Sequence, residues 1–287
     1  MKVLIFGGNS FTAQHFSWRT KYSCKFLSRS DFSYPMDSDE VLGQITEILE
    51  RFEPDVLVNL ISISATSIES PFEYLTSNFQ ICKNLLECCA KSKINLRKFI
   101  QASSAHVYGN AESLKISEGA AIRPASLYAK SKFMSELIAE FYNEEFPILI
   151  TRPFNYTGVG QNERNFFIPK LVSAVINKAP VLTLGELDVI RDFSDVRDID
   201  RYYDALINLQ DFKGVVNLCS GKGYRLKDIV KLVQEISGFR FEIESFKNPP
   251  KNSPSKMQIG CNKKLLELTG IEPIYPIEDT ITWMLNK

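Results

Sequence analysis

The sequence predicts an α/β fold in which a parallel, doubly wound sheet carries helices on both faces and a smaller α/β unit completes the chain. Apolar, strand-like runs alternate with helical stretches over the first half of the 287 residues. A glycine-bearing turn follows the first of these runs, and the pattern becomes less regular in the last third. Such alternation is typical of parallel sheets built with right-handed crossovers.

The expected elements follow in chain order. The first half alternates strands at 2–6, 24–28, 55–62, 98–102 and 148–151 with helices at 11–19, 38–52, 71–91 and 126–146. Helix 71–91 carries apolar residues at three- and four-residue steps, and helix 38–52 ends before Pro54. The last third is expected to hold strands at 190–193 and 214–219 and helices at 165–177, 195–209 and 225–237, the last closed by Gly238. The turn-rich segment 247–254 is expected to be a loop.

Composition excludes several classes of protein. Lys plus Arg and Asp plus Glu both number 34, and the sequence pI is about 6.8, so no basic excess points to nucleic acid. The first apolar run is too short for a signal-peptide core, and no run reaches the length that spans a membrane. The six cysteines and two histidines show no metal-ligand spacing. We therefore expect a soluble cytoplasmic protein with free thiols and no bound metal.

Tyr128 and Lys132 place a phenol and an ammonium on one face of the expected helix 126–146. A cationic neighbour favours the ionised form of a phenol, so the pair could donate and accept a proton. Eleven tyrosines in a lysine-rich chain would give about one such spacing by chance. Two other motifs support a functional role for the pair: Ser103-Ser104 lie upstream of it and Arg152-Pro153 downstream.

The turn at residues 7–13 follows the first strand and opens a helix, which is the context of a dinucleotide-binding fingerprint. Ser10 stands at the second glycine position and Ala13 at the third. A left-handed backbone at Ser10 would cost about 1 kcal/mol, while its hydroxyl could bond a phosphate oxygen. An ordinary strand–helix turn is the competing interpretation.

The segment after the second strand bears on the choice of coenzyme. Arg29 and Ser30 there favour NADP(H), because a guanidinium suits the 2′-phosphate. Asp31 lies close by, and an acidic residue at this strand end would favour NAD(H) instead. A solvated surface charge is the alternative for Arg29.

Taken together, these segments resemble the extended short-chain dehydrogenase/reductase family, the NAD-dependent epimerases and dehydratases of nucleotide sugars. Residues 101–109 resemble its Ser-Ser-x-x-Val-Tyr-Gly segment, and residues 123–128 are similar to its approach to the active-site tyrosine. Residues 73–87 look like its long helix after the third strand. Residues 152–161 and 185–198 resemble GDP-4-keto-6-deoxymannose reductases.

The resemblance implies a Rossmann domain at 1–156 and 195–219 and a substrate domain at 157–194 and 220–287. It implies three catalytic residues, Ser104, Tyr128 and Lys132. It implies coenzyme contacts from Gly7, Ser10, Phe11, Thr12, Arg29, Asp37, Ser62, Asn78, Tyr128, Lys132 and Pro153. It implies substrate contacts from Ser104, Asn155, Asn165, Lys170 and Arg191. Segment 165–170 is expected to close over base and phosphates, with a helix that packs into the smaller domain as the alternative. His106 is a further candidate substrate contact, and a structural or surface histidine is the competing interpretation.

Departures from the family pattern narrow the chemistry. Dehydratases need carboxylates where this chain has Ala105 and His106, which argues against β-elimination. The family's late Arg-Pro, which grips the substrate diphosphate, is matched here by Ser253-Pro254, so Arg191 or Lys251 would have to bear that contact. Asp192 is expected to stabilise its loop rather than react.

The resulting expectation is NADPH-dependent reduction of the C4 ketone of a nucleotide-linked 4-keto-6-deoxyhexose, with NAD(H) also possible. A 4-epimerase that keeps its nicotinamide bound and regenerates it is the first alternative. A catalytically silent cofactor-binding scaffold is the second. By resemblance we also expect a homodimer across helices 71–91 and 126–146 and a role in deoxysugar synthesis for surface polysaccharide such as lipopolysaccharide O-antigen.

Overall fold

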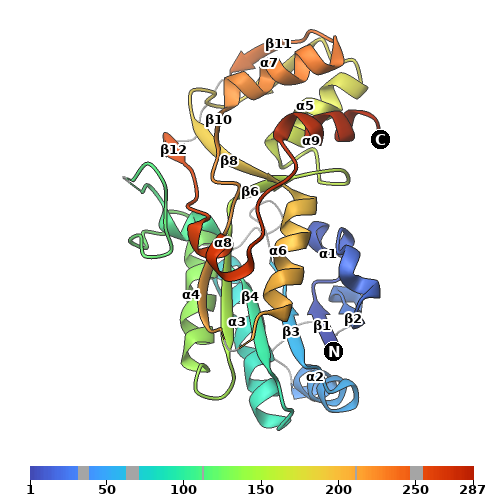
Figure 1. Ribbon diagram of the computed structural model, residues 1–287, viewed down its shortest axis with the longest axis vertical. Helices are drawn as coiled ribbons and strands as arrows, with labels where there is room; N and C mark the ends of the chain where they lie inside the picture. The colour runs from blue at the N-terminus through green and yellow to red at the C-terminus, as the bar shows by residue number, and fades with distance from the viewer. Residues whose placement is uncertain (32–38, 63–70, 112, 211, 246–254) are drawn as a thin grey trace.

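The computed structural model describes residues 1–31, 39–62, 71–111, 113–210, 212–245 and 255–287 (Figure 1). Asp37, Lys251 and the expected loop 247–254 lie outside these residues. The described part contains no helix both long and apolar enough to cross a membrane.

Six parallel strands form the main sheet, which confirms the predicted fold class. Their spatial order is β2 (Ser23–Leu27), β1 (Lys2–Phe6), β3 (Val56–Asn59), β4 (Lys98–Ala102), β5 (Ile148–Pro153) and β9 (Gly214–Leu218). The order reverses direction beside β1, where β2 lies on one side and β3 on the other. A ligand crevice is expected at the carboxyl ends of the strands beside this point.

The sheet buries an apolar face on each side because successive side chains of a strand point opposite ways. Leu4 and Phe6 face α2 (Asp39–Phe52), α3 (Pro71–Lys91) and α4 (Leu127–Phe141). Val3 and Ile5 face α1 (Phe11–Gln14), α6 (Val196–Asn208) and α8 (Lys263–Thr269). The sheet is therefore enclosed by helices from both sides, as a nearly all-apolar strand such as β1 requires.

A second, smaller group of elements lies above this sheet in Figure 1. Strand β8 (Ile190–Asp195) pairs with β6 (Asn155–Thr157), β10 (Gly223–Arg225) and β12 (Met257–Gln258), while β7 (Val181–Leu184) pairs with β11 (Glu242–Ser245). Helices α5 (Phe167–Ile176), α7 (Leu226–Ser237) and α9 (Ile277–Leu285) share one apolar core with β7 and β8. Gly238, predicted to close α7, does so in the left-handed conformation, with φ 67°.

Several expected elements are shorter than predicted: the helix expected at 126–146 spans Leu127–Phe141, and two further cases have identifiable causes. The helix expected at 11–19 ends at Gln14, and a 3-10 turn η1 (Ser17–Thr20) follows. The His15 ring lies 2.8 Å from the Val159 carbonyl oxygen, and the Ser17 amide donates to Asp200 at 3.1 Å, so the chain turns toward α6. The strand expected at 55–62 ends at Asn59, whose side chain accepts from the Ile61 amide at 3.1 Å.

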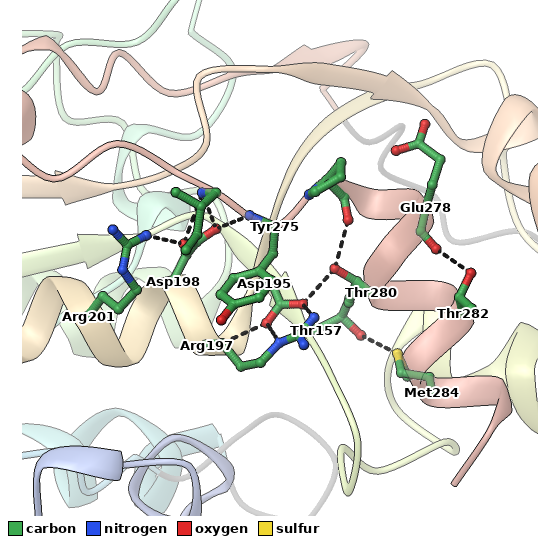
Figure 2. Close-up of polar contacts among 12 residues, drawn as sticks. Thr157, Asp195, Arg197, Asp198, Arg201, Tyr275, Glu278, Thr280, Thr282 and Met284 are labelled. Atoms are coloured by element: carbon green, nitrogen blue, oxygen red, sulfur yellow. Dashed lines mark hydrogen bonds and ion pairs between the residues drawn. The ribbon is translucent and has the colours of Figure 1, made fainter.

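The last part of the chain is tied to the start of α6 by two buried carboxylates (Figure 2). Asp198 accepts from the amides of Ile274 and Tyr275 at 3.1–3.2 Å. Asp195 accepts from the Thr280 hydroxyl of α9 at 2.6 Å. These bonds join α6, which covers the main sheet, to the helix that completes the smaller core.

Candidate active site

A cleft of about 1050 Å³ opens at the carboxyl ends of β1, β3, β4 and β5, where the strand order predicts a ligand site. The main-sheet side is lined by the segment after β1 and by Ser104, Tyr128 and Pro153. The other wall belongs to the smaller group of elements and includes segment 165–169 and Arg191. The volume suits a large extended ligand, because typical pockets for drug-sized molecules range from about 300 to 1,000 Å³.

The turn after β1 is built for a close approach of backbone. Gly7 has φ 91°, and a Cβ there would lie 3.0 Å from the Ile61 nitrogen, so no other residue fits without displacement. The amides of Gly7 and Gly8 both donate to the Leu27 carbonyl at 2.8 Å, which fixes the turn against the end of β2.

Ser10 fits this turn without strain, contrary to the concern raised by the sequence. Its φ is −66°, in the extended region, so no left-handed conformation is needed. Its hydroxyl accepts from the Ala13 amide at 3.2 Å and acts as the N-cap of α1. Ala13 is fully buried in the core beneath, as expected for the residue at the helix–sheet contact.

Phe11 and Thr12, the predicted coenzyme contacts, line the cleft and bond or pack against Tyr156 on its floor. The Thr12 hydroxyl lies 2.8 Å from the Tyr156 hydroxyl, and the Phe11 ring stacks on Tyr156 with centroids 5.9 Å apart. Tyr156 itself was not singled out from the sequence. Its place directly after the Arg-Pro-Phe-Asn segment was the available signal.

Ser104 comes from the end of β4, where the chain enters the 3-10 turn η3 (Ala105–Tyr108). The residue is buried and extended, and its hydroxyl accepts from the His106 amide at 3.2 Å as the N-cap of that turn. The His106 Nδ1 atom also lies 3.0 Å from this hydroxyl. The predicted catalytic serine is therefore held in place by its own turn.

Tyr128 lies in the first turn of α4, which begins after the N-cap Ser126. Burial raises the pKa of Tyr128, while hydrogen bonds with the side chains of Ser62 and Ser104 act in the opposite direction. The contact with Ser104 brings together two of the three predicted catalytic residues. Because the net direction is upward, the phenol keeps its proton near neutral pH, and the expected lowering by Lys132 is not what dominates.

Lys132 lies one turn further along α4 and is almost wholly buried. Its Nζ donates to the carbonyls of Ala102 at 2.9 Å and Ile61 at 3.5 Å, at the ends of β4 and β3. Burial lowers the pKa of Lys132 to about 8. Lys132 itself does not line the cleft; its ammonium bonds to backbone beside two of the strand ends where the cleft opens.

A buried ion pair beneath the serines was not anticipated. Glu136 of α4 accepts from Arg152 Nε at 2.9 Å and Nη2 at 2.6 Å, and Ser103 donates to the same carboxylate. Arg152 Nη1 also donates to the Tyr108 hydroxyl at 3.0 Å. Burial alone would lower the pKa of Arg152, but the Glu136 contact outweighs it and the pKa is raised. The pair locks α4 to β4 and β5 directly behind Ser104.

On the opposite wall, Arg191 of β8 lines the cleft with a half-buried guanidinium. It donates to its neighbour's carbonyl, Ile190, at 2.8 Å and forms no ion pair with any described residue. Burial lowers the pKa of Arg191, which is the electrostatic cost of a cation that lacks a counter-charge. Such a group is suited to bind an anion that enters the cleft.

Asp192 faces away from the cleft and has a structural role, as interpreted from the sequence. Its carboxylate accepts from the Ser220 amide and hydroxyl at 2.9 and 2.7 Å, the Gly221 amide at 3.0 Å and the Gly260 amide at 3.1 Å. Burial raises the pKa of Asp192 to about 6. These bonds join three segments behind Arg191 and so fix its backbone.

The remaining predicted residues divide into two groups. Ser62, Pro153, Asn155 and Asn165 line the cleft, and Asn155 is oriented by a bond to the Asp192 carbonyl at 3.0 Å. Asn78 and Lys170 do not line it: Asn78 donates to Ser131 at 2.9 Å between α3 and α4, and Lys170 donates to the Thr183 carbonyl at 2.8 Å. Arg29 lies in the 3-10 turn η2 (Arg29–Asp31), and its side chain is outside the described part of the structure.

The carboxylate of Asp31, which could have marked an NAD(H) site, forms hydrogen bonds within its own turn. It accepts from the Ser28 amide at 2.6 Å and the Ser28 hydroxyl at 2.8 Å. The backbone bond is the larger influence that lowers the pKa of Asp31, followed by the hydroxyl bond.

Comparison with known proteins agrees with this geometry. The model of the NAD dependent epimerase/dehydratase family matches residues 34–219. The chain belongs to this family. Among family members, the GDP-6-deoxy-D-talose 4-dehydrogenase of Aggregatibacter actinomycetemcomitans is 30% identical over 271 residues, covering 94% of this chain and 92% of that protein. The GDP-6-deoxy-D-mannose reductase of Pseudomonas aeruginosa is 27% identical over 244 residues, covering 81% and 80%.

The family's fold extends over the whole chain. The solved structure of RMD from Pseudomonas aeruginosa, complexed with NADPH, has a TM-score of 0.85 and 24% sequence identity, and the comparison covers 99% of this chain and 96% of that one. Both the six-stranded sheet and the smaller group of elements therefore belong to the family architecture.

Proposed function

We propose that this protein is a nucleotide-sugar 4-ketoreductase, which uses NADPH to reduce the C4 ketone of a nucleotide-linked 4-keto-6-deoxyhexose. The observation that carries the proposal is the contact of the Tyr128 and Ser104 hydroxyls at the edge of a large cleft. The names of the two relatives support it, because 4-dehydrogenation and 4-keto reduction are one reaction written in opposite directions.

The residues on the main-sheet side fit a dinucleotide. The turn at Gly7 packs against the backbone of residues 60–61, and Ser10, Phe11, Thr12, Ser62 and Pro153 line the cleft. When bound, the coenzyme supplies the hydride. In this proposal Arg29, which follows β2, contacts the 2′-phosphate and makes NADP(H) the preferred coenzyme over NAD(H).

Tyr128 is the proposed proton donor to the C4 oxygen. Its raised pKa keeps the phenol protonated in the resting protein, which suits a group that must give a proton to a developing alkoxide. Ser104 donates a hydrogen bond to the same oxygen and stabilises its growing charge. Lys132 favours the tyrosinate once the proton has left and holds the coenzyme ribose from beneath the floor.

Substrate contacts are proposed on the other wall. Arg191, a cation without a described counter-charge, would bind the diphosphate, because a planar guanidinium can bind two oxygens at once. Asn155 and Asn165 also line the cleft and would contact sugar and nucleotide. Segment 165–170 would cover the base.

The proposed enzyme is cytoplasmic and dimeric. All six cysteines are free thiols, which suits a reducing compartment. On α4, which packs against α3, Leu137 is 52% exposed and Phe141 78% exposed, so this face offers apolar side chains to a second copy. The setting we propose is deoxysugar synthesis for surface polysaccharide.

The test is NADPH oxidation in the presence of GDP-, dTDP- and UDP-linked 4-keto-6-deoxyhexoses. We expect turnover with at least one of them, and Tyr128→Phe should lower kcat by about 10²–10⁴-fold while NADPH still binds. Tyr142→Phe is the matched control, since it removes a hydroxyl at the far end of the same helix. Full kcat in Tyr128→Phe, or no NADPH oxidation with any of the sugars, would refute the proposal. Inversion of C4 without net NADPH consumption would establish the 4-epimerase alternative instead.

A further inference from the structure

The Ser104 hydroxyl has three hydrogen-bond partners but only one hydrogen to donate. It owns one hydrogen and two lone pairs. One lone pair accepts from the His106 amide at 3.2 Å. The His106 Nδ1 atom lies 3.0 Å away, and the Tyr128 hydroxyl is also a hydrogen-bond partner. The direction of each bond is therefore coupled to the others, and the tautomer of His106 decides them all.

Only two arrangements of a neutral imidazole satisfy this group. If Nε2 carries the ring hydrogen, Nδ1 is bare and must accept from Ser104, which uses up the serine's only hydrogen. If Nδ1 carries it, the ring donates to the second lone pair of Ser104, and the serine hydrogen remains available to other partners.

The surroundings favour a neutral ring of fixed orientation. The His106 side chain is exposed to solvent on one side, yet desolvation by the protein atoms around it, and after that the positive charge of Arg191, lower the pKa of His106. The ring packs edge-on against Tyr128, with centroids 5.8 Å apart and an interplanar angle of 77°. The imidazole is therefore held against the two hydroxyls and does not serve as a free surface cation.

We infer that His106 carries its hydrogen on Nδ1 and donates it to Ser104 Oγ, so that the only hydrogen of Ser104 is free for the substrate's carbonyl oxygen. The catalytic benefit rests on the proposed function, since it requires an oxygen that accepts from Ser104. His106 is then a positioning residue. Its donor is set before the substrate arrives, which avoids reorganisation when charge develops.

The assignment makes the donors run in one direction. His106 Nδ1–H donates to Ser104, and Ser104 donates to the Tyr128 oxygen, which agrees with the lowering effect of this bond on the pKa of Tyr128. A carbonyl oxygen placed between Ser104 and Tyr128 receives both hydrogens when it replaces these contacts. The opposite tautomer would leave only the Tyr128 hydrogen for that oxygen.

Nitrogen-15 NMR of histidine-labelled protein tests the tautomer directly, because the chain has only two histidines. His15 is an internal reference: its Nε2 lies 2.8 Å from the Val159 carbonyl, which can only accept, so His15 must be the Nε2–H form. With NADPH bound and at a mildly alkaline pH, we expect His106 to give the Nδ1–H pattern, distinct from that of His15. An Nε2–H pattern for His106 would overturn the inference. The His106→Asn spectrum assigns the signals.

Three variants test the consequence for turnover. His106→Asn can place an amide N–H near the position of Nδ1, whereas His106→Gln carries its amide nearer that of Nε2 and His106→Ala has none. We expect kcat to stay within about threefold of wild type in His106→Asn and to fall about 10–100-fold in the other two variants. Removal of an oxyanion donor lowers kcat by about 10²–10³-fold, and the loss is smaller here because the Ser104 hydroxyl remains and only the direction of its hydrogen changes. The Kd for NADPH, measured by tryptophan fluorescence, should be unchanged in all three.

Equal kcat values in the three variants would refute the positioning role. Failure of the proposed function would look different: wild-type protein would turn over none of the keto sugars, and the tautomer of His106 would still be read from the NMR spectrum.

Discussion

Glu136→Gln is the substitution whose effect follows most directly from the structure. The Glu136 side chain is 1% exposed and that of its partner Arg152 is 5% exposed. Two hydrogen bonds join them, and Ser103 shares the carboxylate. Glutamine keeps the shape but removes the negative charge, so Arg152 is left as a buried cation without compensation. Removing one member of such a pair costs about 3–5 kcal/mol of unfolding free energy.

Urea unfolding followed by tryptophan fluorescence measures this loss. With a slope of about 3 kcal/mol/M, the expected loss lowers the midpoint by about 1–1.7 M. Glu267→Gln is the matched control, since its pair with Lys263 is exposed and has a separation of 3.7 Å, and we expect a change within about 0.5 kcal/mol. A loss below about 1 kcal/mol in Glu136→Gln would refute the reasoning.

The double variant separates charge from packing. Glu136→Leu together with Arg152→Met removes both charges and fills a similar volume, so no uncompensated cation remains. We expect it to be more stable than either single variant by at least about 1 kcal/mol, although Ser103 and Tyr108 each lose a partner. A double variant as unstable as the sum of the singles would show that the pair acts through geometry instead of charge.

Three further predictions concern other parts of the fold and site. Gly109→Ala should lower stability by more than about 2 kcal/mol in thermal unfolding, because φ is 59° and a Cβ would lie 2.0 Å from the Arg123 carbonyl oxygen; an unchanged Tm would contradict this. The pKa of Lys132 is lowered from 10.5 to about 8, so between these pH values the folded protein binds fewer protons at this residue than the unfolded chain does. Lys132 therefore lowers the unfolding free energy most below pH 8, and this loss disappears as the pH rises above 10.5. The unfolding free energy of Lys132→Met relative to wild type should therefore decrease by up to about 3 kcal/mol from pH 7 to above pH 10, and a constant difference would be inconsistent with a buried ammonium. Arg29→Ala should weaken NADPH binding by about 1.5–3 kcal/mol in titrations and leave NADH nearly unchanged, whereas equal losses for both would remove Arg29 from the phosphate site.

The long, continuous elements could be predicted from sequence because their signals are local. The predicted bounds of Lys2–Phe6, Pro71–Lys91 and Lys98–Ala102 are those of β1, α3 and β4. Strands β10, β11 and β12 carry no comparable signal, since they are two to four residues long and form only by pairing with distant segments. The short α1 was mispredicted for a similar reason: the residues after it bond to Val159 and Asp200, more than 140 positions away.

The same distinction holds within the site. Ser104 and Tyr128 carry recognisable local motifs, and the structure brings their side chains into contact. The ion pair of Glu136 with Arg152 could not be predicted, because the local sequence around each residue carries no signal that this helix and this buried strand place their charged side chains in contact. Lys170 was predicted from resemblance alone, and its ammonium donates to the Thr183 carbonyl of β7 and does not line the cleft.

The bonds of Asp195 and Asp198 to the last part of the chain have a consequence for biosynthesis. The main sheet receives its sixth strand, β9, only after β6, β7 and β8 of the smaller group have been made, and α9 follows all the other elements of the smaller core in chain order. The smaller core therefore cannot be completed before α9 has been synthesised. Premature termination shortly before Thr280 should therefore yield a product that quality-control proteases degrade, even though every residue proposed to touch coenzyme or substrate would already be present.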